Sequence, residues 1–111
     1  MGQGIDYPPE GNYPHNKVCR WTIRREKSYL LKFHRFNLEH DSDCDYDYVR
    51  IDTGTKMCGS VFPSDVYLRG NSSVTVTFRS DSSQSGRGFK AEIIGTCLFS
   101  LFSCTAIPLY S

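Results

Sequence analysis

Apolar and polar residues alternate along several short segments of the chain, and no stretch shows the period of an amphipathic helix. In the clearest segment Val74, Val76 and Phe78 fall on one face and polar residues on the other. Turn-forming residues separate such segments, a pattern typical of antiparallel strands with one face in water. Two sheets packed face to face bury all the apolar faces, so we predict an all-β fold, an antiparallel β-sandwich. The expected strands are 18–24, 29–38, 46–51, 73–79 and 89–94.

The second of these segments changes its alternation halfway along. Leu31 and Phe33 share one parity, whereas Phe36 and Leu38 share the other. One extra residue in a strand reverses the parity of all that follow, so we expect a β-bulge or bend at 34–35.

The composition is that of a small single domain. With 111 residues the chain can bury one core but not two, and its net charge of +1 gives no field that would attract nucleic acid. A basic set precedes an acidic run, and we interpret both mainly as solvated faces and loops. The basic residues are Arg20, Arg24, Arg25, Lys27, Lys32 and Arg35.

Five cysteines in so short a chain, none of them in a CxxC pair, indicate an oxidising, extracellular environment. Asn71 begins an Asn-Ser-Ser sequon, which agrees with a secreted glycoprotein. Residues 1–16 are polar and rich in Pro and Gly, unlike the apolar centre of a signal peptide. We therefore expect an excised module, a fragment or an unusual isoform of a secreted protein.

The composition changes abruptly at Gly95, because the remaining residues, GTCLFSLFSCTAIPLYS, include no charged side chain. This segment is too short and too interrupted to span a bilayer, which needs about 20 apolar residues. We favour a single domain over 1–94, with 95–111 as an apolar tail outside it. A final strand or cysteine-linked cap and a membrane-associated anchor are the alternatives.

The most informative segment is 36–51, FNLEHDSDCDYDYVRI, which carries five carboxylates within nine residues. Strand alternation places Asp47 on the same face as the expected core residues Val49 and Ile51. A carboxylate at the edge of an apolar core is costly unless it is hydrogen-bonded, neutralised or bound to a cation. The segment therefore predicts a metal ion or a basic partner.

Other kinds of site lack the motifs they need. Asp41, Asp43 and Asp45 have the spacing of an EF-hand loop, but Tyr46 and Asp52 stand where that loop needs glycine and glutamate. The sequence contains neither GxSxG nor HExxH, and no glycine-rich loop precedes a helix that could bind phosphate. We therefore predict that the chain is not an enzyme.

Seven short motifs, in this order and at these spacings, resemble the CUB domain family over about residues 5–94. The resemblance implies a jelly-roll-like β-sandwich and an extracellular location, in agreement with the alternation and the cysteines. The motifs are GNYP (11–14), CRWTI (19–23), LKFHRFNLE (31–39), CDYDYVRI (44–51), CG (58–59), TFRSDSS (77–83) and GFKAEI (88–93).

The resemblance is to the calcium-binding type, which implies one Ca²⁺ between loops at one end of the sandwich. The motif of that type is Glu, four residues, Cys, two residues and Asp, followed later by the Asp of a Ser-Asp pair. By this similarity the side chains of Glu39, Asp47 and Asp81 are ligands, and the carbonyl of Ser83 is a further candidate. Tyr13 resembles a tyrosine that braces the site by hydrogen bonds.

Members of that type receive a Lys or Arg of a partner protein on the same carboxylates. A metal that fixes the acceptor oxygens in advance lowers the ordering cost of such a charge-assisted bond. Tyr13, Glu39 and Asp47 would then form the centre of a protein-binding surface, with His40 at its rim.

The resemblance also implies a disulfide between Cys44 and Cys58. Cys19 matches a cysteine whose usual partner lies upstream, where this chain has only MGQGIDYPPEGN, so the N-terminal part is incomplete relative to the family. Cys19 is then free and buried, or pairs with Cys97 or Cys104.

The resemblance leads us to expect a secreted, non-enzymatic module that binds Ca²⁺ and another extracellular protein, and that can be an accessory domain of a protease. The alternatives are a purely structural spacer and a metal-independent, spermadhesin-like module that binds carbohydrate or sulfated polysaccharide. Its basic strand surface would consist of Arg24, Arg25, Lys27, Lys32 and Arg35.

Overall fold

The computed structural model describes residues 3–25, 29–68, 73–94 and 97–106. These residues form eight strands and no helix, so they contain no apolar helix of membrane-spanning length. The strands are β1 (Gln3–Tyr7), β2 (Lys17–Arg25), β3 (Tyr29–Asn37), β4 (Tyr48–Ile51), β5 (Val66–Leu68), β6 (Ser73–Arg79), β7 (Gly88–Ile94) and β8 (Cys97–Ala106).

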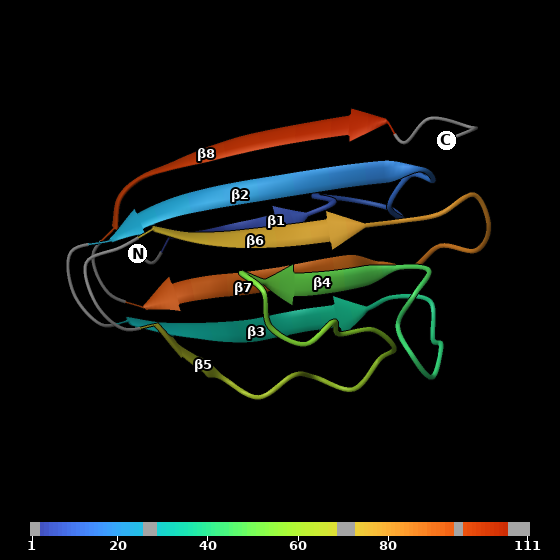
Figure 1. Ribbon diagram of the computed structural model, residues 1–111, viewed down its shortest axis with the longest axis horizontal. Helices are drawn as coiled ribbons and strands as arrows, with labels where there is room; N and C mark the ends of the chain where they lie inside the picture. Colours follow the sequence, from blue (N-terminus) through green and yellow to red (C-terminus); the bar gives the residue numbers. More distant parts are fainter. Residues whose placement is uncertain (1–2, 26–28, 69–72, 95–96, 107–111) are drawn as a thin grey trace.

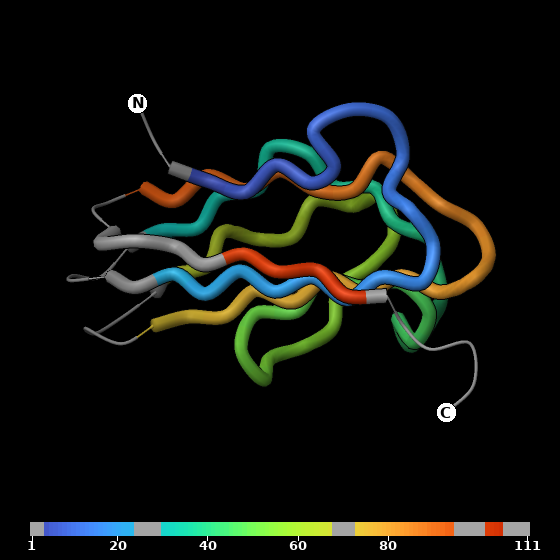
Figure 2. The backbone as a smooth tube through the Cα atoms, turned by 90° about the horizontal axis from the view of Figure 1, so that it is seen from above, coloured from blue at the N-terminus to red at the C-terminus, as the bar shows by residue number. Residues whose placement is uncertain are grey.

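The strands form two four-stranded sheets in which every pairing is antiparallel, with the orders β1-β7-β3-β5 and β4-β6-β2-β8. The two sheets lie face to face as two layers (Figures 1 and 2). The predicted all-β sandwich is therefore confirmed.

The apolar positions of the alternating segments fill the space between the sheets. Val74, Val76 and Phe78 of β6 are at most 1% exposed. The Trp21 ring of β2 packs edge-on against Phe89 of β7, which joins the two layers at the centre of the core. Burial of large aromatic side chains of this kind is the main favourable contribution to folding in a small domain.

The predicted bulge is present in β3. The register of β3 against β7 shifts between Phe33 and Arg35, so that His34 is the extra residue. Because of this shift both Phe33 and Phe36 are buried, at 4% and 3% exposed. The change of parity in the sequence therefore marked a real feature of the strand.

The favoured interpretation of residues 95–111 as a tail outside the domain is wrong for 97–106. This segment is β8, which pairs with β2 along its whole length, and its Cys104 forms a disulfide with Cys19. The ring of Phe102 also stacks on Trp21, with centroids 4.8 Å apart. Of the states that the sequence left open for Cys19, the structure shows the disulfide with Cys104.

Candidate metal centre

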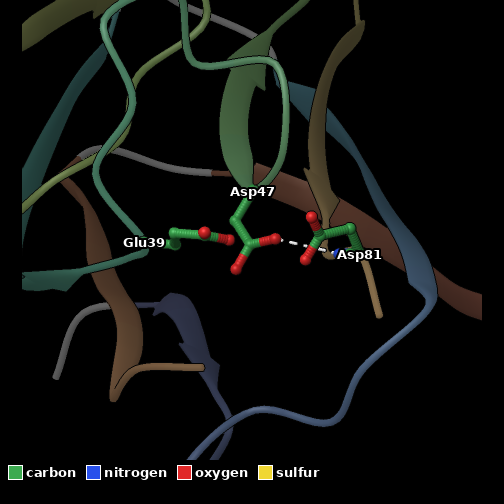
Figure 3. Close-up of side chains that lie close together, drawn as sticks. All are labelled: Glu39, Asp47 and Asp81. Atoms are coloured by element: carbon green, nitrogen blue, oxygen red, sulfur yellow. Dashed lines mark hydrogen bonds between the residues drawn. The ribbon is translucent and has the colours of Figure 1, made fainter. Parts of the chain in front are cut away.

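Three loops meet at one end of the sandwich, on the right in Figure 1, and each contributes a carboxylate. Glu39 follows β3, Asp47 directly precedes β4 and Asp81 follows β6. The pairing of Tyr48 with Arg79 brings Asp47 close to Asp81, because both lie just beyond the last pair of the β4–β6 ladder. Carboxylate oxygens of all three residues lie within 4.8 Å of one another (Figure 3).

Asp47 is fixed by hydrogen bonds on both of its oxygens. It is 0% exposed, and it shares the inward face of the strand with Val49, as the alternation predicted. Oδ1 accepts the backbone N–H of Asp81 at 2.9 Å, and Oδ2 accepts the hydroxyl of Tyr13. A buried carboxylate without such donors would be strongly destabilising.

Tyr13 connects Asp47 to the segment that carries the glutamate. Its hydroxyl oxygen also accepts the backbone N–H of Glu39 at 3.1 Å. The side chain is 2% exposed, and its ring packs edge-on against Phe78 with centroids 4.9 Å apart. The hydroxyl is therefore held in place by the core.

Glu39 presents a buried oxygen that has no hydrogen-bond partner. Its Oε1 has almost no accessible surface, and none of the residues that the structure describes donates to it. Figure 3 shows that the side chain points toward the carboxylate of Asp47. A carboxylate with one buried, unpartnered oxygen beside two further carboxylates matches the hard oxygen donors that a calcium ion requires.

Two carboxylates of the cluster, Glu39 and Asp47, have raised pKa values. Burial raises the pKa of Glu39, and the charges of Asp81, Asp47 and Asp41 raise it further. Burial also raises the pKa of Asp47, although its hydrogen bonds from Tyr13 and from the backbone of Asp81 act in the opposite direction. Burial together with Asp47 raises the pKa of Tyr13, so this residue stays a neutral donor. The charged form of the cluster therefore destabilises the fold unless a cation neutralises it.

These shifts predict how the calcium-free protein responds to pH. A carboxyl whose pKa is raised on folding stabilises the fold most below its unfolded pKa, about 4, and this contribution is lost as pH rises through the folded pKa. In EDTA we expect Glu39→Gln to gain stability relative to the wild type as pH rises from about 4 to neutral. Thermal melting of both proteins across this range measures the difference. A difference independent of pH would contradict the raised pKa of Glu39.

The other acidic residues of the run lie beside the cluster. The side chain of Asp41 accepts the backbone N–H groups of Asp43 and Asp45, each at 3.2 Å, and so closes the loop. The sequence predicts only solvated charge for Asp41 and does not predict these two bonds. The tendency of Asp to bond to backbone two residues on was the signal that could have indicated them. Asp43 and Asp45 are exposed, as expected. The predicted disulfide between Cys44 and Cys58 is present and links this loop to the loop between β4 and β5.

The remaining predicted site residues are only partly located. His40 is exposed and directly follows Glu39. Ser83 is exposed, and its backbone N–H donates to Asp81 at 3.1 Å, while a ligand role of its carbonyl stays a prediction. Asn71 and Lys27 lie outside the described residues.

The basic residues do not share one strand surface. Arg24 and Arg25 belong to β2 of one sheet, whereas Lys32 and Arg35 belong to β3 of the other. Arg35 also has internal partners, because its guanidinium pairs with Asp6 at 2.9 Å and donates to three backbone carbonyls. The four described positions of the alternative basic surface therefore belong to strands of two different sheets.

Comparison with known proteins agrees with this architecture. The chain is 36% identical over 85 residues to the zinc metalloproteinase nas-39 of Caenorhabditis elegans, covering 74% of the chain and 9% of that protein. It is 34% identical over 100 residues to human cubilin, covering 78% of the chain and 3% of cubilin. The chain thus spans less than a tenth of the length of these curated relatives.

Solved structures and a family model also match this chain to CUB domains. A crystal structure of the MASP-1 CUB2 domain bound to Ca²⁺ superimposes with a TM-score of 0.71 at 30% identity, covering 83% of this chain and 90% of that one. The CUB1-EGF-CUB2 part of human MASP-1/3 gives a TM-score of 0.70 at 28% identity, covering 88% of this chain and 42% of that one. The model of the CUB domain matches residues 3–93. The chain therefore belongs to the CUB domain family.

Proposed function

We propose that this CUB domain is an extracellular module that binds one Ca²⁺ at Glu39, Asp47 and Asp81, and uses the ordered loops to bind a partner protein. CUB domains are non-catalytic interaction modules of extracellular proteins. The observation that carries the calcium proposal is the carboxylate cluster with the unpartnered buried oxygen of Glu39. A CUB domain that is 30% identical to this chain has been crystallised with Ca²⁺.

The chain's own residues would set the geometry of the ligand oxygens. Tyr13 and the backbone of Asp81 hold the two oxygens of Asp47, and Tyr13 also holds the backbone at Glu39. Three side-chain ligands leave room for backbone carbonyls, with Ser83 as the proposed one, and for water in a coordination shell of about six to eight oxygens. A bound calcium ion would reduce the electrostatic repulsion between these carboxylates, because its positive charge offsets theirs.

We further propose that a Lys or Arg of the partner binds on this cluster. Among the residues that the structure describes, no basic side chain pairs with Glu39, Asp47 or Asp81, whereas Asp6, Asp45 and Glu92 each have a basic partner within the chain. A cation from another protein would complete the charge balance at a site whose acceptors are already fixed. His40 would lie at the rim of this contact.

Calcium titration tests the metal site. At a calcium concentration about 100 times the Kd, we expect the wild type to gain about 2.7 kcal/mol, a rise of roughly 10 °C or more in Tm. Glu39→Gln should lose most of this gain, because it removes one charged ligand. Asp43→Asn is the matched control, since it removes an exposed charge of the same acidic run and should keep the full gain. No shift of the wild-type Tm at millimolar calcium would contradict the proposal.

A further inference from the structure

Two adjacent apolar side chains, Val61 and Phe62, are exposed in the loop that connects β4 to β5. Val61 is 83% exposed and Phe62 is 54% exposed. Single exposed apolar residues are common on protein surfaces and need no explanation. The position of this pair in the fold, however, places it at the same end of the sandwich as the carboxylate cluster.

The loop is anchored beside the carboxylate cluster immediately before the pair. Cys58 is bonded to Cys44, and the carbonyl of Gly59 accepts the backbone N–H of Leu38 at 2.9 Å. A Cβ on Gly59 would lie only 3.3 Å from the His40 ring, so the loop packs closely against the residues on both sides of Glu39. Figure 1 shows this loop running back to the end of the sandwich where β3 ends.

This anchor fixes where the apolar pair lies relative to the cluster. Val61 and Phe62 follow Gly59 by two and three residues, which limits their Cα atoms to about 11 Å from it. Gly59 itself contacts the neighbours of Glu39. The apolar pair therefore lies at the end of the sandwich that carries the carboxylate cluster.

Of the other large exposed side chains among the described residues, Tyr46 directly precedes Asp47 but stands alone, at 49% exposed, and the remaining three lie elsewhere. Phe102 is 55% exposed but already stacks on Trp21. Tyr67 and Ile94 both lie next to Leu30 in the sheet register, at the end of β3 opposite to Glu39. Val61 and Phe62 are the exposed apolar pair whose backbone is tied to the segment around Glu39.

We infer that Val61 and Phe62 form an apolar subsite that selects partners in which an apolar side chain lies next to the Lys or Arg bound by the carboxylates. This inference rests on the proposed function of the cluster. The side chains of Lys and Arg have apolar stems below their charged groups, so the residue that enters an acidic centre also brings apolar surface to its rim. The Phe62 ring offers in addition a face for a cation or for a second apolar group.

Three blocked peptides test the subsite against ¹⁵N-labelled protein in millimolar calcium, with Kd values taken from NMR titration. They are Gly-Ser-Lys-Leu-Phe-Ser-Gly, a version with Ser-Ser in place of Leu-Phe, and a version with Ala in place of Lys. We expect the first to bind about tenfold more tightly than the second, as burial of an apolar side chain implies. The third should not bind at the cluster.

Variants of the protein separate the subsite from the carboxylate site. Phe62→Ser should weaken the first peptide about tenfold and the second, which keeps only the Lys stem, by a smaller factor. Tyr67→Ser is the matched control, because it removes a more exposed aromatic ring at 73% from another part of the surface, and it should change neither peptide. Equal binding of the first two peptides, unaffected by Phe62→Ser, would overturn the subsite and leave the carboxylate site standing. Absence of Lys-dependent binding in calcium would overturn the proposed function and the subsite with it.

Discussion

Cys104→Ser is expected to lower the free energy of unfolding by about 4 to 5 kcal/mol, the largest effect of any single substitution considered for this domain. The disulfide joins residues 85 apart in sequence, so it removes a large amount of conformational freedom from the unfolded chain. Without it, β8 is held to the sandwich by its ladder to β2 and by the stacking of Phe102 on Trp21. Urea denaturation of the wild type and the variant measures the loss.

The control for this substitution is Ser103→Ala, which alters an exposed residue of the same strand and keeps both disulfides. We expect a change of less than about 1 kcal/mol for it, as for most substitutions outside a special contact. Trp21 is the single tryptophan of the chain, so its fluorescence reports directly on β8. A red shift in folded Cys104→Ser would show release of the strand, and a stability loss below about 1 kcal/mol would contradict the structural role of the bridge.

Tyr13→Phe is expected to destabilise the calcium-free protein by about 2 to 4 kcal/mol at neutral pH. The substitution keeps the ring that packs on Phe78 and removes only the hydroxyl. Asp47, which is fully buried, then loses a donor while charged, and the backbone N–H of Glu39 loses its acceptor. Chemical denaturation in EDTA measures the effect.

The pH dependence of this loss distinguishes it from a packing defect. The bond from Tyr13 favours the charged form of Asp47 and lowers its pKa, so its removal raises that pKa further. The loss should therefore shrink as Asp47 becomes protonated at acidic pH. Tyr7→Phe is the matched control: this ring packs on the same Phe78, and its hydroxyl has no hydrogen bond to the part of the chain that the structure describes. An equal loss for both variants would contradict the bracing role of Tyr13.

Strand prediction succeeded where one face of a strand is buried and the other is wet. β6 shows this pattern without interruption, and the sequence also located the bulge in β3 because an inserted residue reverses the parity of its apolar positions. β8 was misinterpreted for the opposite reason. Its residues, CLFSLFSCTA, do not alternate and include no charge, so local pattern gave no register. Pairing with β2 decided its place.

The candidate metal site, like the fold, was predicted only in part. Family resemblance supplied Glu39, Asp47 and Asp81, and the structure brings these three together. The hydrogen bonds of Asp41 within its loop and the apolar pair at Val61 and Phe62 were not foreseen. The preference of Asp for bonds to backbone two residues on was the signal available for Asp41. The exposed pair has no such signature, because its place beside the site depends on where the loop is anchored.

The sequence by itself determined the class of fold and the bulge, which follow from the parity of apolar positions. The family resemblance implied the bridge between Cys44 and Cys58, which is present, and pointed to the three acidic residues that the structure brings together. Only the tertiary structure decided that Cys19 pairs with Cys104, that the basic residues are divided between two sheets, and that Glu39 has a buried oxygen without a partner. The physical reason is that sequence pattern specifies which face of a strand is buried. Contacts between segments far apart in the chain arise from backbone pairing and core packing, which no single segment encodes.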